Sequence, residues 1–230
     1  MEFQNPCPGE FLARPNRFVA LCRVDGREKR VHVKNTGRLR ELLLPSAPVL
    51  LSRSDAPGRR TAFDLRCVRT ETGWVCVDSQ LPNALAADYL PRLLPGLRWL
   101  RPEQRYGESR FDFAFETDAG PGFAEVKGVT LLREGVALFP DAPTVRGERH
   151  LRELMAARQA GYQALVLFVI QRKGARVLRP NVATHPGFAR ALAEADAAGV
   201  ALHAVDCRVT ERETVCDAAV PVDTRIQEAP

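Results

Sequence analysis

The sequence predicts a mixed α/β protein, in which a small β-barrel is followed by an α/β domain with a mixed central sheet. Short strand patterns separated by turn residues fill the first third of the chain. Helical and strand patterns alternate after it, as in α/β folds. The change falls near residues 80–83, so we expect a barrel domain over 1–82 and an α/β domain over 83–230. With 230 residues, 45% of them hydrophobic, the chain can build two modest cores.

Short strands are expected throughout the first domain. Asp25-Gly26 is a turn signal between two apolar runs and predicts a hairpin. The expected strands are 17–24, 28–33, 49–54, 61–70 and 74–79. Five strands packed this closely favour a small barrel over an α/β unit. The segment GRLRELLLP between them is interpreted as one short helix ended by Pro45.

Helices and strands alternate in the second domain. Helices are expected at 84–94, 147–161 and 185–199, the last two stopped by glycines. Alternating strands are expected at 111–116 and 122–129, and continuously apolar, buried strands at 164–170 and 200–207. The tail after Cys216 is expected to be partly disordered.

Composition excludes several classes of protein. No stretch approaches the ~20 apolar residues that span a bilayer, and the N-terminal residues show no signal-peptide pattern. We therefore expect a cytoplasmic protein without a membrane partner. The six cysteines show no C-x-x-C spacing, which favours free thiols over a zinc site.

Charge points to an anionic partner. Residues 1–82 hold 14 Lys and Arg against 9 Asp and Glu, whereas the remainder is neutral. Such an excess favours nucleic acid, although a solvated arginine-rich surface would look the same. The candidate phosphate-binding residues flank Gly37 and are Lys34, Asn35, Thr36, Arg38 and Arg40. A tight turn with a polar rim is the alternative. Only Phe18 and Trp74 offer stacking surfaces, which argues against a strict preference for single strands.

The sharpest chemical feature is SRFDF followed by EVK. Glu125 and Lys127 lie two apart on one strand and share a face, while Val126 points into the core. If the two strands pair, Asp112 lies beside Glu125. Carboxylates about 4–6 Å apart repel unless a divalent cation lies between them, and oxygen ligands suit Mg²⁺ or Mn²⁺. A solvated ion pair of Glu125 with Lys127 is the alternative.

Several motifs in order resemble the sugar fermentation stimulation protein A (SfsA) family. They are HVKNTGRLRELLLP, SRFDF, EVKGVTL and FPDAPTVRGERHLREL, and the resemblance runs from about Arg17 to Cys207. It implies an OB-like barrel, then a restriction-endonuclease-like domain of the PD-(D/E)XK nuclease type. It also implies DNA binding and a role in regulating sugar metabolism genes. Phe111 stands where that nuclease pattern usually has proline.

The resemblance assigns roles to individual residues. Asp112 matches the first acidic position, and Glu125 and Lys127 match the (D/E)XK half. Asp112, Glu125 and the backbone carbonyl of Val126 would hold Mg²⁺ or Mn²⁺, and Lys127 would assist the attacking water. A further acidic ligand is left open between Asp88, Glu103 and Glu108.

Three residues of the motif after the site are further candidates. Asp141 would supplement the metal shell, Arg146 would hold a phosphate, and His150 would contact the scissile phosphate or carry a proton. Each has a structural alternative: a turn residue, a surface charge and a partly buried helix residue.

Two functions from different classes remain open. The first is a magnesium-dependent phosphodiesterase acting on DNA, and the second a DNA-binding regulatory protein without useful turnover. An RNA or nucleotide substrate is a third alternative. DNA binding is expected without strong sequence specificity, and the oligomeric state is left open, with a homodimer among the alternatives.

Overall fold

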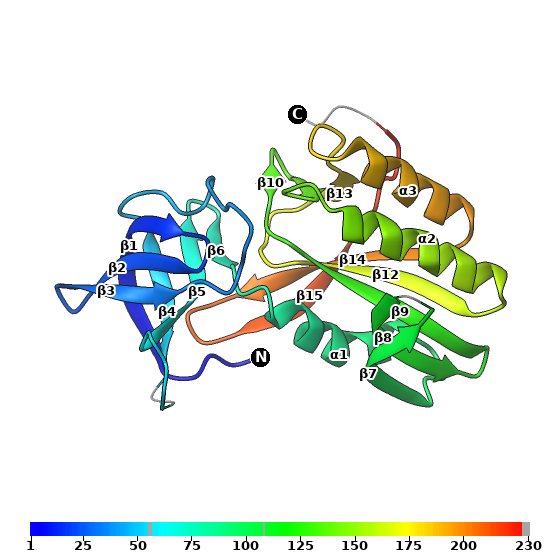
Figure 1. The fold of residues 1–230 in the computed structure, drawn as a ribbon, viewed down its shortest axis with the longest axis horizontal. Coiled ribbons are helices and arrows are strands. Elements are labelled where there is room, and N and C mark those ends of the chain that lie inside the picture. The colour runs from blue at the N-terminus through cyan, green and yellow to red at the C-terminus, as the bar shows by residue number, and fades with distance from the viewer. Residues whose placement is uncertain (55–56, 108, 227–230) are drawn as a thin grey trace. The chain divides into compact units, whose positions relative to one another are not determined.

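A computed structural model describes residues 1–54, 57–107 and 109–226, and the chain divides into two compact units (Figure 1). The barrel unit comprises Met1–Leu81 together with two later segments, Gln171–Gly174 and Cys207–Val215. The sheet unit comprises the rest of the described chain. The candidate ligand Glu108 and the last four residues of the tail lie outside the described residues.

Five strands close the barrel. The six-stranded sheet has the order β3-β2-β1-β4-β5-β6, and a short parallel pairing of β3 with β5 closes the first five strands on themselves (Figure 1). The strands are β1 (Pro6–Asn16), β2 (Val19–Val24), β3 (Arg27–His32), β4 (Pro48–Arg53), β5 (Phe63–Thr70) and β6 (Gly73–Cys76). Alternating residues such as Ala20, Cys22 and Val24 fill the interior. The predicted barrel is confirmed.

Strand β1 was not predicted, because its sequence contains three prolines. Residues 6–9 pair only with β4, Glu10 pairs with both β4 and β2, and the residues after it pair only with β2. Pro6 and Pro8 therefore lie where the other edge of the strand has no partner, so their missing N–H groups leave no ladder bond unmade. Pro15 falls at a register shift between Ala13 and Asn16.

The helix predicted over residues 37–45 is wrong. The structure has turns there, and Leu39 adopts a φ of 49°, which breaks any helical run. Leu39, Leu42 and Leu43 are all buried in the barrel core. One folded turn, and not a helix, therefore buries these leucines. In this turn, Leu43 N–H donates to Leu39 C=O (2.9 Å).

A mixed sheet forms the second unit, with the order β15-β14-β12-β9-β8-β7. Strands β7, β8 and β9 form an antiparallel meander, while β12 runs parallel to both β9 and β14. The bounds are β7 (Trp99–Tyr106), β8 (Ser109–Thr117), β9 (Gly120–Val129), β12 (Gln163–Ile170), β14 (Ala201–Val209) and β15 (Thr214–Val220). A small sheet joins β10 (Leu132–Arg133), β11 (Val136–Phe139) and β13 (Val177–Pro180).

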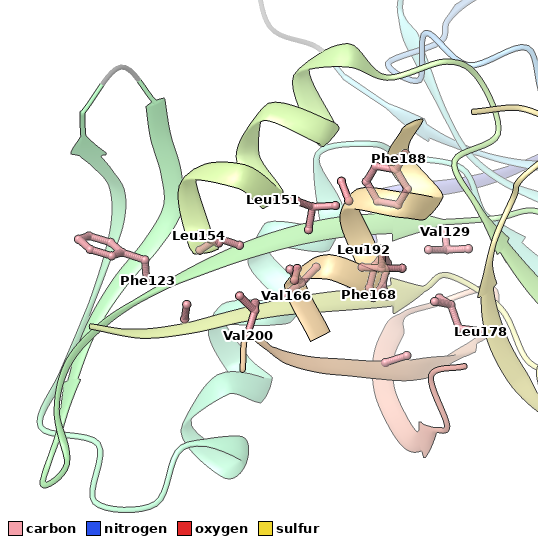
Figure 2. Packing of buried hydrophobic residues seen from close by; sticks show 14 of the residues in the cluster. Phe123, Val129, Leu151, Leu154, Val166, Phe168, Leu178, Phe188, Leu192 and Val200 are labelled. Carbon is pink, nitrogen blue, oxygen red and sulfur yellow. The ribbon is translucent and has the colours of Figure 1, made fainter. Parts of the chain in front are cut away.

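Helices α2 (Val145–Gln159) and α3 (Pro186–Ala197) cover one face of this sheet, and α1 (Leu81–Leu93) lies on the other side (Figures 1 and 2). Leu151 and Leu154 of α2 pack with Phe188 of α3 against Val166 and Phe168 of β12 (Figure 2). Strand β12 is buried along nearly its whole length, as its continuous apolar run predicts. The mixed α/β class is thus confirmed.

Some strands of this unit escaped prediction. Strand β7 has mostly exposed residues and contains Pro102, so it lacks an apolar alternation. Strands β10, β11 and β13 have two to four residues each. The tail after Cys216 was expected to be partly disordered, but it continues β15 to Val220, and Asp223 N–H donates to Leu178 C=O (2.9 Å). Among the described residues, no helix is long and apolar enough to cross a bilayer.

Candidate active site

The site lies where β8 and β9 separate. Their antiparallel ladder runs from Thr117↔Gly120 to Phe113↔Ala124. The next pair in register would be Asp112 with Glu125, and there the ladder stops. Strand β9 continues alongside β12, whereas β8 continues alongside β7. Asp112 and Glu125 therefore lie next to each other in a fork between two strands that each have another neighbour.

Asp112 bridges this fork. Its Oδ2 accepts a hydrogen bond from the Val126 N–H (2.8 Å), which replaces a lost ladder bond. Its Oδ1 accepts from Nδ2 of Asn83 on α1 (2.8 Å). Burial raises the pKa of Asp112, and the negative charge of Glu125 raises it further, against the opposing effects of the Val126 N–H, Asn83 and Lys127.

Glu125 is 3% exposed and is held from two sides. Lys127 Nζ donates to its Oε1 (2.6 Å), and Nδ1 of His150 on α2 bonds the same oxygen. Burial alone would raise the pKa of Glu125, but His150 and Lys127 together outweigh it and lower the pKa. The other oxygen, Oε2, is buried and has no hydrogen-bond partner.

Helix α2 supplies a chain of polar contacts behind Glu125. Arg146 Nε donates to His150 Nε2 (3.3 Å). Because arginine only donates, His150 accepts at Nε2 and carries its proton on Nδ1, which then donates to Glu125. The helix begins at the cap Thr144, whose side chain accepts from Gly147 N–H (3.0 Å). His150 is 2% exposed, so it lies behind the carboxylate and away from solvent.

These contacts allow a test of whether a divalent cation fits. Two carboxylates meet in a partly buried fork, and the unpartnered Glu125 Oε2 is the kind of oxygen that a hard cation takes. Opposing this, no group of three or more Asp, Glu, His or Cys side chains suited to a metal occurs in the described ranges. The protein therefore offers two carboxylate ligands, and water or a phosphate oxygen would have to complete the shell, as magnesium sites commonly allow.

The other acidic candidates lie elsewhere. Asp88 is exposed on α1, and Glu103 is exposed and paired with Arg110 (3.1 Å). Asp141 is exposed in the segment before α2. The structure brings the N–H of Val126 to Asp112, and coordination through its carbonyl remains a prediction. Arg146 is exposed, which leaves its guanidinium accessible beside His150.

Asn83 and the tautomer of His150 are features that sequence reasoning missed. Asn83 is 29 positions before Asp112 and bonds it directly. Its only signal in the sequence is a lone amide at the start of an apolar helix, which resembles a helix-start residue. A hydrogen bond between residues far apart in the sequence depends on the fold and leaves no pattern in the local sequence.

The predicted phosphate-binding cluster in the barrel divides into two kinds of residue. Lys34 is drawn inward by Asp78 (3.4 Å) and Asp64 (3.9 Å). Asn35 accepts from Gly37 N–H through its side chain (2.8 Å), which is a tight-turn contact. Thr36, Arg38 and Arg40 are exposed.

Arg14 builds the turn that carries this cluster. Its guanidinium donates to the carbonyls of Asn35 (2.7 Å), Gly37 (2.7 Å) and Arg38 (2.9 Å). Three bonds to one turn fix its backbone. Hydrogen bonds within the barrel therefore fix the glycine-containing turn. In the part of the chain described, its Arg38 and Arg40 are exposed cations without an ion pair.

Two family models match most of the chain. The model of the SfsA N-terminal OB domain matches residues 12–77, and the model of the sugar fermentation stimulation protein RE domain matches residues 80–213. The chain belongs to the SfsA family. A sugar fermentation stimulation protein homolog of Desulfitobacterium hafniense strain Y51 is 49% identical over 212 residues, covering 92% of this chain and 93% of that one. The homolog of Enterococcus mundtii is 40% identical, covering 97% and 96%.

A solved SfsA structure has the same fold. The SfsA of Pyrococcus furiosus, determined in complex with Ca²⁺, superimposes with a TM-score of 0.86 at 30% identity. The match covers 97% of this chain and 98% of that one. The OB assignment of the barrel, suggested by its closed five-stranded topology, is confirmed by the family match.

Proposed function

We propose that this SfsA family protein is a DNA-binding phosphodiesterase that uses Mg²⁺ or Mn²⁺ at the fork between β8 and β9. The observation that carries the proposal is Glu125. A buried carboxylate is fixed at one oxygen by Lys127 and His150, while its second oxygen has no partner. Burying an unsatisfied charged oxygen is costly, which favours a function for it over a packing role.

The proposed ligand set is the pair of carboxylates in the fork. Asp112 and Glu125 would hold the cation, which supplies Lewis-acid polarisation of a phosphate oxygen and an activated water when bound. The Ca²⁺ complex of the Pyrococcus furiosus relative supports a site for a hard divalent cation in this family. Hard oxygen ligands are the donors that such cations prefer.

The surrounding residues act on the ligands and the substrate. The Val126 N–H and Asn83 fix the Asp112 carboxylate. Lys127 is 13% exposed, and its ammonium contacts Glu125. There it would orient a water and stabilise charge on the phosphate. Arg146, exposed at the start of α2, would bind a neighbouring phosphate.

Cleavage of supercoiled plasmid tests this proposal. Wild-type protein with Mg²⁺ or Mn²⁺ should convert it to nicked or linear forms, and EDTA should prevent the conversion. Glu125→Gln should abolish turnover, because the amide keeps the shape and loses the anionic ligand. Glu194→Gln, an exposed glutamate on α3, is the matched control. Absence of cleavage by wild-type protein under every divalent cation would refute the enzymatic proposal.

A regulatory protein without turnover is the second candidate. Its supporting observation is the small ligand set, since the described residues offer no cluster of three metal-binding side chains. The small ligand set and the excess of basic residues in the first 82 positions together favour DNA binding without cleavage. Metal-independent DNA binding without cleavage would establish this alternative.

A further inference from the structure

A basic groove on the barrel is lined by residues other than the fork carboxylates and the Lys34–Arg40 turn. It encloses about 540 Å³ and lies beside the point where β3 meets β5. Its lining includes Phe18, Arg30, His32, Arg59, Arg60 and Thr61. We call it the Phe18 groove. We infer that it binds single-stranded polynucleotide, with one base stacked on Phe18 and the flanking phosphates on Arg30 and Arg60.

The barrel topology opens this groove. The parallel pairing between β3 and β5 is limited to Val31↔Phe63 and His32↔Asp64. Residues before these pairs, Arg30 on one side and Thr61 on the other, are not joined by the ladder. The short pairing of β3 with β5 therefore leaves a gap between Arg30 and Thr61. Its volume falls within the roughly 300–1,000 Å³ of typical ligand pockets.

The backbone of Phe18 is fixed by two hydrogen bonds. It lies at the tip of the hairpin between β1 and β2, where its N–H donates to the Asn16 side chain (2.9 Å). Its carbonyl accepts from Val33 N–H (2.8 Å). Phe18 is nevertheless 46% exposed. A large apolar ring kept at the surface on a fixed backbone is a pre-organised stacking surface.

The charges around the ring fit a phosphate backbone. The described residues that line the groove include no Asp or Glu. Asp64 lies behind it and engages Arg59 and His32. By contrast, Arg30 and Arg60 are exposed and make no ion pair with any residue that the structure describes. Arg17 lies over the Phe18 ring (4.8 Å from its centroid) and adds another cation at the same place.

Stacking determines the class of ligand. Duplex DNA hides its base faces between neighbouring pairs, so an exposed ring can stack only on unpaired bases. An aromatic ring accepts every base, which predicts little sequence preference. Unpaired DNA and unpaired RNA share this chemistry, and the experiment below separates them.

The inference rests on the proposed function only in taking a polynucleotide as ligand. Measuring oligonucleotide binding in EDTA separates the test of the Phe18 groove from the test of the metal site. A failed metal site would leave Phe18-dependent binding intact, and a failed groove would leave metal-dependent cleavage intact.

The experiment measures fluorescence anisotropy of labelled oligonucleotides of about 12 nucleotides, within the range that such barrels cover. Oligo-dT, oligo-U and a duplex are titrated with the full chain in EDTA, between roughly 50 and 200 mM salt. Phe18→Ala should weaken single-strand binding about 5- to 150-fold, the range for losing one stacked base, without changing the salt slope. Phe18→Trp should restore the affinity. Leu44→Ala, another exposed apolar side chain of the barrel unit, should bind like wild type.

The double variant Arg30→Ala/Arg60→Ala should reduce the slope of log K against log salt by about 1.4, or about 0.7 for each single-strand phosphate. Arg38→Ala/Arg40→Ala removes the same charge from the other surface and should reduce it less. Preference for oligo-dT or for oligo-U would identify the natural strand, and both support the groove. Wild-type affinity in Phe18→Ala, or equal loss on single strand and duplex, would overturn it.

Discussion

Replacing Glu125 by Gln should destabilise the sheet unit, although it removes one of two adjacent carboxylates. Relief of repulsion on Asp112 favours the variant. Opposing this, the charge-assisted bonds from Lys127 and His150 become bonds to a neutral amide. Bonds to charged groups contribute about 1.5–3 kcal/mol each, and neutral ones about half as much. Lys127 is nearly buried, so screening discounts little of this loss.

We therefore expect a net loss of about 1–3 kcal/mol at neutral pH. The sign of the pH dependence follows from the lowered pKa of Glu125. A lowered pKa stabilises the fold above the ordinary value of 4.5, and this contribution disappears as pH falls through the folded-state value. The difference between wild type and variant should thus be full above about pH 5 and shrink in more acidic solution.

Urea unfolding followed by tryptophan fluorescence measures this difference. The chain has two tryptophans, Trp74 in the barrel unit and Trp99 in the sheet unit, so a Trp74→Phe background reports the sheet unit alone. Glu194→Gln is the exposed control and should unfold like its parent. A Glu125→Gln variant as stable as wild type at pH 7 would refute the claim that His150 and Lys127 hold an ionised Glu125.

Three further predictions follow from the same structure. Asp112→Asn should gain stability relative to wild type as pH rises from 4 to 7, because a raised pKa makes the ionised form unfavourable in the fold; a pH-independent difference in urea midpoints would contradict this. Lys127→Ala should retain metal binding but lose at least about 100-fold in plasmid cleavage, as general acid–base or electrostatic partners do; unchanged cleavage would exclude Lys127 from the reaction. Limited proteolysis should cut near residues 80–83 before it cuts β12, which is buried along nearly its whole length, and a first cut within β12 would contradict the expected domain boundary.

Periodicity in the sequence predicted the elements whose burial is regular. The apolar run at 164–170 and the amphipathic pattern of α2 each correspond to a structural element. Periodicity did not predict the segments whose conformation depends on contacts with other parts of the chain. The prolines of β1 are accommodated by unpaired edges, and the leucines after Gly37 fill the barrel from a turn.

The candidate site shows the same limit. Strand spacing placed Glu125 and Lys127 on one face, and the structure joins them by a hydrogen bond. No spacing argument could provide Asn83, which reaches Asp112 from another element. Nor could it show that Lys34 points to Asp78, since that ion pair forms between distant strand ends. Contacts of long sequence separation arise from topology, and a single sequence does not display them.

The most direct test of the metal proposal is calorimetric titration of Mn²⁺ into wild-type protein and Glu125→Gln. If Asp112 and Glu125 hold the cation, wild type should bind one ion and the variant should give no binding heat, because the amide lacks the anionic oxygen that a hard cation needs. Equal binding by wild type and Glu125→Gln would place the metal elsewhere and contradict the proposed active site.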